Sequence, residues 1–539
     1  MIFSDLPNEL VVRIFAYTLP YHFENVVSCC RRFYAASQPL LVKHNKLRKT
    51  FRSVHLRQRV AWDSDHDSFV EYTAAIDSTN ALVFEIAKEP IIADYIVNLN
   101  LNLQWYSGGE ATEVTSEYAD IYDTADRFRG DRTALLRLLE SSSFEIVKDN
   151  IGYWESDLSR RHQDCFYEDG DSPAALLLTL LPNLESLALP STWRRNNVIT
   201  GKETAIGVPL TECQETLSDL MFDIVKRAND TNQSGQALAK LLKIMPTENI
   251  DRQIGEDMVT IVPFLGLRSL REVYSASCVF LDQENKDEAV AWNRYQPLGR
   301  NLEVLELKDY ALGNDAAGVL LKDMHKLRVF SLGYQMKDEI GGDIIAQTFV
   351  NHLMNAAGDS LEELSLTVCD SYPYWSMSKP IRRLSGFRKL THFVLSTSYL
   401  YSCNELECGA HVPCQEHSTA VDHTAASCPS LLELLSGSLG TLQEIKLYVD
   451  LLKDDYLCLQ RLLKDLDYDP KLNNKEGGWS RMPHLSEVRV YTDIADGPTA
   501  EAGEKISHDE ARLELDALRL KYGISYEIAK YGPLGEDER

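Results

Sequence analysis

The chain has 539 residues, of which 44% are hydrophobic and 25% are charged, so its length and composition allow a large buried core. Its formal net charge is −26, although residues 1–60 carry ten Lys or Arg against three Asp or Glu. An acidic body repels a phosphate backbone, so we expect no nucleic acid as a partner of the main domain. The basic N-terminal stretch suits an acidic partner, or is simply a solvated helix surface.

The sequence shows no sign of export or of a membrane anchor. The first residues lack the basic and apolar regions of a signal peptide, and no apolar run approaches the roughly 18 residues of a spanning helix. The eleven cysteines are then expected to be thiols in a reducing compartment, or metal ligands. We therefore expect a protein of the cytoplasm or nucleus that has no contact with a membrane.

The first fifty residues predict three short helices. Asp5 is a suitable N-cap, and Pro7 fits the first turn, where its missing N–H has no helical partner. Pro20 ends this helix, and two further apolar segments follow, the second of them after Pro39. The apolar residues of the first helix lie on one stripe: Leu6, Leu10, Ile14 and Phe15. So small a piece buries little surface by itself, which favours an apolar face turned to a partner.

Three stretches of this region share the spacing of a known motif. They are Leu6-Pro7-x-Glu9-Leu10-x-x-x-Ile14-Phe15, Leu19-Pro20, and Val26-Val27-x-x-Cys30-Arg31-Arg32-Phe33-Tyr34. Together they resemble the F-box motif of fungal-type F-box proteins. Two departures are the absence of the usual Asp-Leu after the first helix and the presence of Phe33 where the family often has Trp. The alternative is an ordinary amphipathic helix.

The resemblance implies a partner for this module. F-box motifs bind a Skp-type adaptor, and through it a cullin scaffold. Carried over by position, the adaptor-binding residues are Leu6, Pro7, Leu10, Ile14, Phe15, Val27, Cys30 and Phe33.

Beyond residue 90 one apolar pattern recurs. An apolar residue is followed at intervals of three by a leucine and by an apolar-x-apolar pair, as in Leu181-Pro-Asn-Leu184-Glu-Ser-Leu187-Ala-Leu189. The second leucines at 270, 302, 327, 361 and 390 are 32, 25, 34 and 29 residues apart. The closing pair is strand alternation, and helix-like stretches lie between the copies. Strand, helix and strand at short intervals predict a parallel sheet.

This spacing resembles the leucine-rich repeat. The predicted fold is therefore α/β: a three-helix F-box followed by an irregular leucine-rich-repeat solenoid, a curved parallel sheet with helices on its convex side. An ordinary doubly wound α/β domain is the alternative. The predicted domains are an F-box at 1–48, a helical linker at 49–90, the solenoid at 91–531 with insertions near 105–170, 190–266 and 396–430, and a polar tail at 532–539.

Cysteine and histidine are concentrated in the last of these insertions. Thiolate and imidazole are the usual ligands of zinc, and four suffice for a structural site. The candidate metal ligands are Cys403, Cys408, His411, Cys414 and His417, with His423 and Cys428 close behind. The alternative is a loop of unpaired thiols, and we expect no other cofactor.

The predicted strands also indicate a recognition surface. Because strand leucines face the core, their neighbours must face the other side of the sheet. These neighbours are Glu272, Tyr274, Glu306, Lys308, Glu363, Thr367, His392, Glu444, Lys446, Glu487, Arg489 and Tyr491. Aromatic and basic groups, which are enriched at binding hot spots, gather at Lys446, Tyr448, Arg489 and Tyr491. These four are the candidate target-binding residues, unless the face is merely solvated.

No nucleophile elbow, phosphate loop or metal-plus-acid signature is recognised, so we expect no enzymatic activity of the chain itself. The resemblance implies the substrate-recognition subunit of a cullin-type (SCF) ubiquitin ligase, with a target protein on the solenoid. The alternative is a protein-binding scaffold whose F-box engages the adaptor without directing ubiquitylation.

Overall fold

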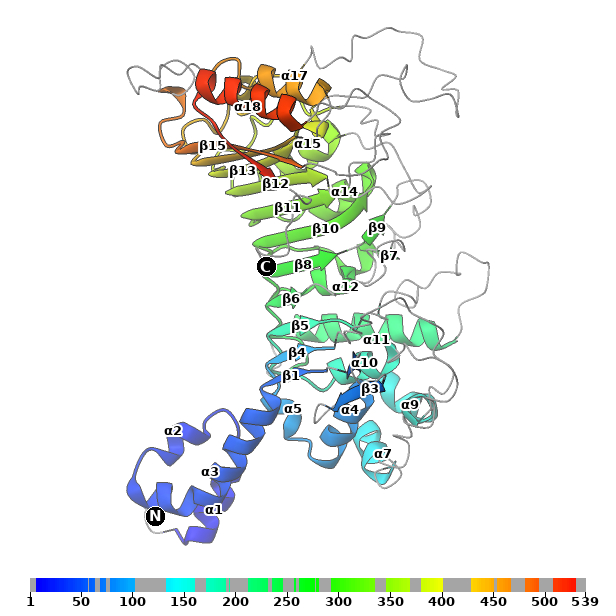
Figure 1. Cartoon of the computed structure of the whole chain (residues 1–539). Helices are drawn as coiled ribbons and strands as arrows, with labels where there is room; N and C mark the ends of the chain where they lie inside the picture. The colour runs from blue at the N-terminus through cyan, green and yellow to red at the C-terminus, as the bar shows by residue number, and fades with distance from the viewer. Residues whose placement is uncertain are drawn as a thin grey trace. The chain divides into compact units, whose positions relative to one another are not determined.

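The protein is described by a computed structural model (Figure 1). The residues that it describes are 6–56, 58–63, 68–73, 78–101, 132–159, 171–190, 193, 212–230, 235–245, 256–257, 261–276, 278–280, 292–334, 346–368, 380–400, 428–449, 453–466, 480–493 and 508–529. The chain divides into two compact units, residues 1–248 and 249–539.

The first unit begins with three helices, as the apolar segments predict. They are α1 (Asn8–Ala16), α2 (Phe23–Val27) and α3 (Arg31–Phe51). Their common core consists of four buried side chains, which are between 0 and 3% exposed: Val11, Phe15, Phe23 and Val27. The rings of Phe15 and Phe33 meet edge to face with their centroids 5.1 Å apart, which joins α1 to α3.

Two details of this module differ from the expectation. Pro7 is the N-cap of α1 and not part of its first turn, while Asp5 lies outside the described residues. The third helix runs through Pro39 without ending there. Leu40 and Leu41 pack against the same core as Phe33, so packing on both sides of Pro39 offsets its lost backbone hydrogen bond.

The segment at 49–90, predicted as a helical linker, also contains strands. Strand β1 (Ser53–His55) follows α3 almost directly and pairs in parallel with β4 (Asn98–Asn100). A hairpin of β2 (Gln58–Asp63) and β3 (Ser68–Thr73) comes next, before α4 (Thr79–Lys88) and α5 (Ile92–Tyr95). The helical prediction missed β1 because a three-residue strand with one buried apolar residue, Val54, has no visible periodicity.

The sheet of the first unit is parallel and has the order β1-β4-β5-β6, with β5 at Ser186–Ala188 and β6 at Lys243–Met245. Four described helices of the first unit lie in the predicted insertions near 105–170 and 190–266: α7 (Arg132–Glu140), α8 (Glu145–Asp149), α9 (Ile151–Ser159) and α11 (Glu212–Ala228). A further helix, α10 (Asp171–Leu178), precedes β5.

Among its described residues, the second unit contains eight parallel strands that pair in the order in which they occur along the chain. They are β8 (Glu272–Ala276), β10 (Val304–Leu312), β11 (Val329–Tyr334), β12 (Glu363–Val368), β13 (His392–Ser396), β14 (Glu444–Val449), β15 (Glu487–Asp493) and β16 (Ser525–Ala529). Two short strands, β7 (Glu256–Asp257) and β9 (Cys278–Phe280), pair with each other, and β9 also pairs with β10. The prediction of an α/β fold with a parallel sheet is confirmed, and the strand order is solenoid-like.

Helices or short helical turns connect most of these strands. They are α12 (Val262–Leu265), η6 (Asn293–Tyr295), α14 (Asn314–Leu321), α15 (Ala346–Ala357), η7 (Thr397–Tyr399), α16 (Leu431–Leu434), α17 (Lys453–Leu462) and α18 (His508–Tyr522). Figure 1 shows α12, α14 and α15 on the same side of the stacked strands. No helix among the described residues is both long enough and apolar enough to cross a bilayer.

The repeated leucine pattern forms the core of this sheet. Each strand contributes one fully buried apolar side chain at the same register position, from Leu305 through Phe330, Leu364, Phe393 and Ile445 to Val488. The residues on either side of these positions are half-buried or exposed. One face of the sheet is therefore packed, and the opposite face carries the polar residues.

Candidate protein-binding surfaces

The first candidate surface lies on α1, on the side turned away from the core. Leu10 is 46% exposed, Ile14 37% and Tyr17 81%, and Pro7 is exposed at the start of the helix. These four residues recur at helical spacing, so they form one stripe, which we call the α1 surface. An apolar stripe of this kind on a small helical module is typical of an interface with another protein.

Contacts from α3 fix the beginning of this stripe. The Arg32 guanidinium donates to the backbone carbonyl of Leu6 and, at 3.1 and 3.2 Å, to Oδ1 of Asn8. Leu6 itself is half-buried and packs against the helical core. The first turn of α1 is thereby held in place before any partner binds.

The eight predicted adaptor-binding residues fall into two groups. Pro7, Leu10, Ile14 and Cys30 are exposed, and Leu6 and Phe33 are half-buried. Phe15 and Val27 are 0 and 3% exposed, so these two side chains form the core and do not face a partner. A helix that is apolar on two sides gives no sequence signal for which side is buried.

Sequence reasoning missed Tyr17, the most exposed apolar side chain of the α1 surface. Its position three residues after Ile14 was the available signal. Tyr34 and Val42 on α3 are also exposed, at 53 and 68%.

A polar cluster joins the helical module to the sheet of the first unit. Asn183, which is 5% exposed, donates from its amide nitrogen to the hydroxyl oxygen of Tyr21 and, at 2.7 Å, to the carbonyl of Asp94. Lys240 Nζ donates to Oδ1 of Asn183 at 2.8 Å and lies 5.1 Å from the centroid of the Tyr21 ring. Burial raises the pKa of Tyr21, so its hydroxyl stays neutral here.

A second contact supports this junction. His44 on α3 is 3% exposed, and a hydrogen bond of 2.8 Å joins its Nδ1 to the hydroxyl of Tyr95 on α5. Burial, with smaller contributions from Asp94 and Glu89, raises the pKa of Tyr95 to about 12. The α1 surface therefore has a defined orientation relative to the first strands of the sheet.

The second candidate surface lies on the polar face of the second unit, on β14 and β15. It contains the four residues predicted to bind a target. The register pairs Lys446 with Arg489 and Tyr448 with Tyr491, so the four form a compact patch that we call the tyrosine face. The rings of Tyr448 and Tyr491 are stacked, with centroids 5.1 Å apart and planes 19° from parallel.

Neighbouring carboxylates hold the cations of the tyrosine face. Arg489 donates to Oε2 of Glu487 at 2.6 Å and to the hydroxyl oxygen of Tyr491 at 3.1 Å. Ser525 on β16 donates to the other oxygen of Glu487 at 2.5 Å. The Arg489 guanidinium, followed by the Ser525 hydroxyl, lowers the pKa of Glu487. Lys446 Nζ lies 3.7 Å from Oε1 of Glu444, so the patch is pre-organised.

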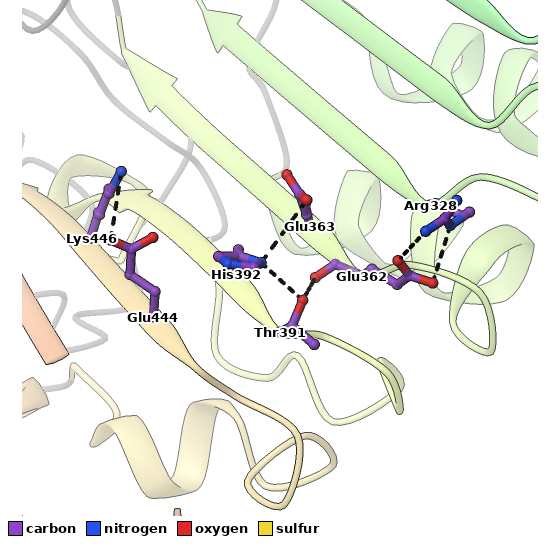
Figure 2. Close-up of polar contacts among 7 residues, drawn as sticks. All are labelled: Arg328, Glu362, Glu363, Thr391, His392, Glu444 and Lys446. Atoms are coloured by element: carbon purple, nitrogen blue, oxygen red, sulfur yellow. Dashed lines mark hydrogen bonds and ion pairs between the residues drawn. The ribbon is translucent and has the colours of Figure 1, made fainter. Parts of the chain in front are cut away.

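The polar face continues onto β12 and β13, as Figure 2 shows. His392 Nδ1 lies 4.0 Å from Oε1 of Glu363 and 2.9 Å from Oγ1 of Thr391. The Thr391 hydroxyl donates to the carbonyl of Glu362 at 2.9 Å. The Arg328 guanidinium donates two hydrogen bonds, of 3.1 and 2.7 Å, to the Glu362 carboxylate and lowers its pKa. The opposite charges of Arg328 and Glu362, which lie just before β11 and β12, therefore cancel each other.

Register places several carboxylates of this face in one row across the strands. From β8 to β15 the row contains Glu272, Val304, Val329, Glu363, His392, Glu444 and Glu487. At the β8 end, burial followed by the charges of Glu272 and Glu306 raises the pKa of Tyr274 to about 12. All the predicted face residues are half-buried or exposed.

The predicted zinc ligands Cys403, Cys408, His411, Cys414 and His417 lie outside the described residues. Within the part of the chain that is described, no three metal-ligating side chains come together. No known family model matches the sequence, and a search among curated proteins finds no similar one.

Proposed function

We propose that the chain is the substrate-recognition subunit of a cullin-type ubiquitin ligase. Residues 6–51 are an F-box that binds a Skp-type adaptor, and the repeats of the second unit are irregular leucine-rich repeats that bind a target protein. The observation that carries the proposal is the exposure of Leu10 and Ile14 at positions that match the F-box motif, while Phe15 beside them fills the core.

The adaptor half is supported by the chemistry of the α1 surface. Truncating a central apolar anchor of an interface commonly costs about 2 kcal/mol or more, so Leu10 and Ile14 suffice as the main contacts. Arg32 and the core beneath α1 hold them before binding, which lowers the entropy cost of association.

The target half is supported by the tyrosine face. Stacked tyrosines provide a rigid, amphipathic contact area at low entropy cost, and Arg489 is the residue type most often found at hot spots besides Trp and Tyr. Glu444 and Glu487 beside them are paired with Lys446 and Arg489, which holds the patch in place before a target binds.

In this function the chain contributes position and not bond-making chemistry. Binding the target and the adaptor at once raises the local concentration of target lysines near the ubiquitin-carrying enzyme. No side chain of this protein then takes part in the transfer step.

The test is a reconstituted ubiquitylation reaction. Full-length protein and the variant with Lys446, Tyr448, Arg489 and Tyr491 changed to Ala are used to recover partners, which are then offered to the assembled ligase. The matched control changes Leu513 and Leu520 to Ala, because these residues are 70 and 71% exposed and belong to α18, not to β14 or β15. We expect the wild type and the control to recover adaptor and a ubiquitylated target, and the quadruple variant to recover the adaptor alone.

Three results would contradict parts of this proposal. Failure of the wild type to recover an adaptor would remove the F-box assignment. A target that binds but is never ubiquitylated would indicate the scaffold function. Targets that persist with the quadruple variant would place recognition outside the tyrosine face.

A further inference from the structure

Two cysteines of the second unit lie in direct contact although they are 30 residues apart in sequence. Cys428 precedes α16, in the connection between β13 and β14, and Cys458 lies on α17, in the connection between β14 and β15. Their side chains are 5 and 0% exposed, and the two Sγ atoms are 2.8 Å apart. The spacing of cysteines along the sequence gives no hint of this pair.

The distance between the two Sγ atoms distinguishes a pair of cysteines that binds one metal ion from a pair that can form a disulfide. Two thiolates on one zinc ion, each about 2.3 Å from the metal at a tetrahedral angle, are held roughly 3.8 Å apart. The bond of a disulfide is about 2.05 Å long. At 2.8 Å the sulfurs are too close to share a metal, and they need to approach by less than 1 Å to form a bond.

We propose that Cys428 and Cys458 are an oxidation site, which a hydrogen peroxide-type oxidant converts into a disulfide. The sulfur of Cys428, the more accessible of the two, attacks one peroxide oxygen and becomes a sulfenic acid, while the thiol proton passes to the other oxygen, which leaves as water. The Cys458 sulfur then attacks the sulfenic sulfur and displaces a second water. Two thiols are oxidised by two electrons, and one peroxide is reduced to two waters.

The bond would close a loop around part of the candidate target site. Strand β14, with Lys446 and Tyr448, lies between the two cysteines in the chain. A hydrogen bond of 3.3 Å from the Thr397 hydroxyl to the carbonyl of Tyr448 already ties the end of this strand to η7. Cross-linking the connections on either side of β14 removes freedom from the unfolded chain, so the disulfide stabilises the second unit.

The test uses the full-length protein and does not depend on the proposed function. Reduced protein is treated with stoichiometric hydrogen peroxide, remaining thiols are alkylated, and peptides are analysed by mass spectrometry without reduction. We expect a linked peptide pair joining Cys428 to Cys458 and a rise of about 5 °C in the melting temperature of the second unit, reversed by dithiothreitol.

Two sets of variants control this experiment. Cys458→Ser and, as a second variant, Cys458→Ala should lose both the linked peptide and the temperature shift. The double change Cys29→Ser and Cys30→Ser, which removes two exposed thiols, should keep both. The inference is overturned if Cys428 and Cys458 remain alkylatable while Cys29 and Cys30 are oxidised, or if Cys428 is linked to a different cysteine.

Discussion

The α1 surface and the tyrosine face both present large side chains to solvent, but different forces hold those side chains in place. On α1, Leu10 and Ile14 are exposed aliphatic groups whose position is set by the core underneath, above all by Phe15. The polar contacts of Arg32 hold only the first turn of the helix, at the Leu6 carbonyl and Asn8. Binding at this surface is expected to follow the apolar area that a partner covers, with little dependence on salt.

On the tyrosine face, neighbouring side chains orient one another. Arg489 is held between Glu487 and Tyr491, and Tyr448 stacks on the same tyrosine. Binding here is expected to weaken at high ionic strength, because exposed charge pairs are screened. The α1 surface thus depends on packing and the tyrosine face on a polar network, so each can be disrupted without the other.

The largest effect is expected from the core beneath the α1 surface. Phe15→Ala removes a fully buried ring and should destabilise the helical module by about 3–5 kcal/mol, seen as faster amide exchange in α1 to α3. Leu10→Ala, five residues earlier on the same helix and exposed, should change stability by less than about 0.5 kcal/mol. Equal losses of stability from Phe15→Ala and Leu10→Ala would contradict the assignment of Phe15 to the core and of Leu10 to the surface.

A smaller effect is expected from truncating the α1 surface, which should weaken adaptor binding without destabilising the helical module. Changing both Leu10 and Ile14 to Ala should weaken the affinity for a Skp-type adaptor by about 30-fold or more, measured by titration, because both anchors are truncated. Leu513 and Leu520 changed to Ala provide the matched control and should leave the affinity unchanged. An unchanged affinity in the α1 variant would show that binding does not use this stripe.

The sequence predicted the strands far better than the contacts between them. The repeated leucines located the strands of the second unit, and the shared repeat position of Tyr448 and Tyr491 predicted that they lie on one face. Burial of Phe15 was not predictable, because α1 is apolar on two sides. The contact of Cys428 with Cys458 was hidden because it depends on how two connections pack and not on local spacing.

The junction between helices and sheet provides an intermediate test. Asn183→Ala removes an amide that is 5% exposed and leaves the Asp94 carbonyl without that donor, which should cost about 1–3 kcal/mol. Protection of α5 and the loop at Tyr21 against amide exchange should fall. Asn45→Ala, an exposed asparagine on α3, is the control and should have no such effect.

The smallest effect concerns the titration of the tyrosine face. The pKa of Glu487 is lowered from its ordinary value of 4.5 by Arg489 and Ser525. Because the pKa of Glu487 is lower in the folded protein than in the unfolded chain, its ionised carboxylate stabilises the fold at pH values above the unfolded pKa. This stabilisation is lost as the pH falls through the folded pKa. Carboxyl NMR shifts should therefore give Glu487 a pKa below the ordinary value, and Arg489→Ala should return its pKa toward that value. Arg328→Ala, which disturbs a separate ion pair, should not.

Hydrogen–deuterium exchange of the full chain, with and without a recombinant Skp-type adaptor, tests the central claim most directly. The measurement locates the contact and detects binding at the same time. We predict protection of residues 6–17 and of the beginning of α3, with no change in β14 to β16. Absence of protection in α1, or protection confined to the sheet of the second unit, would contradict the assignment of this module as the adaptor-binding part of a ubiquitin ligase.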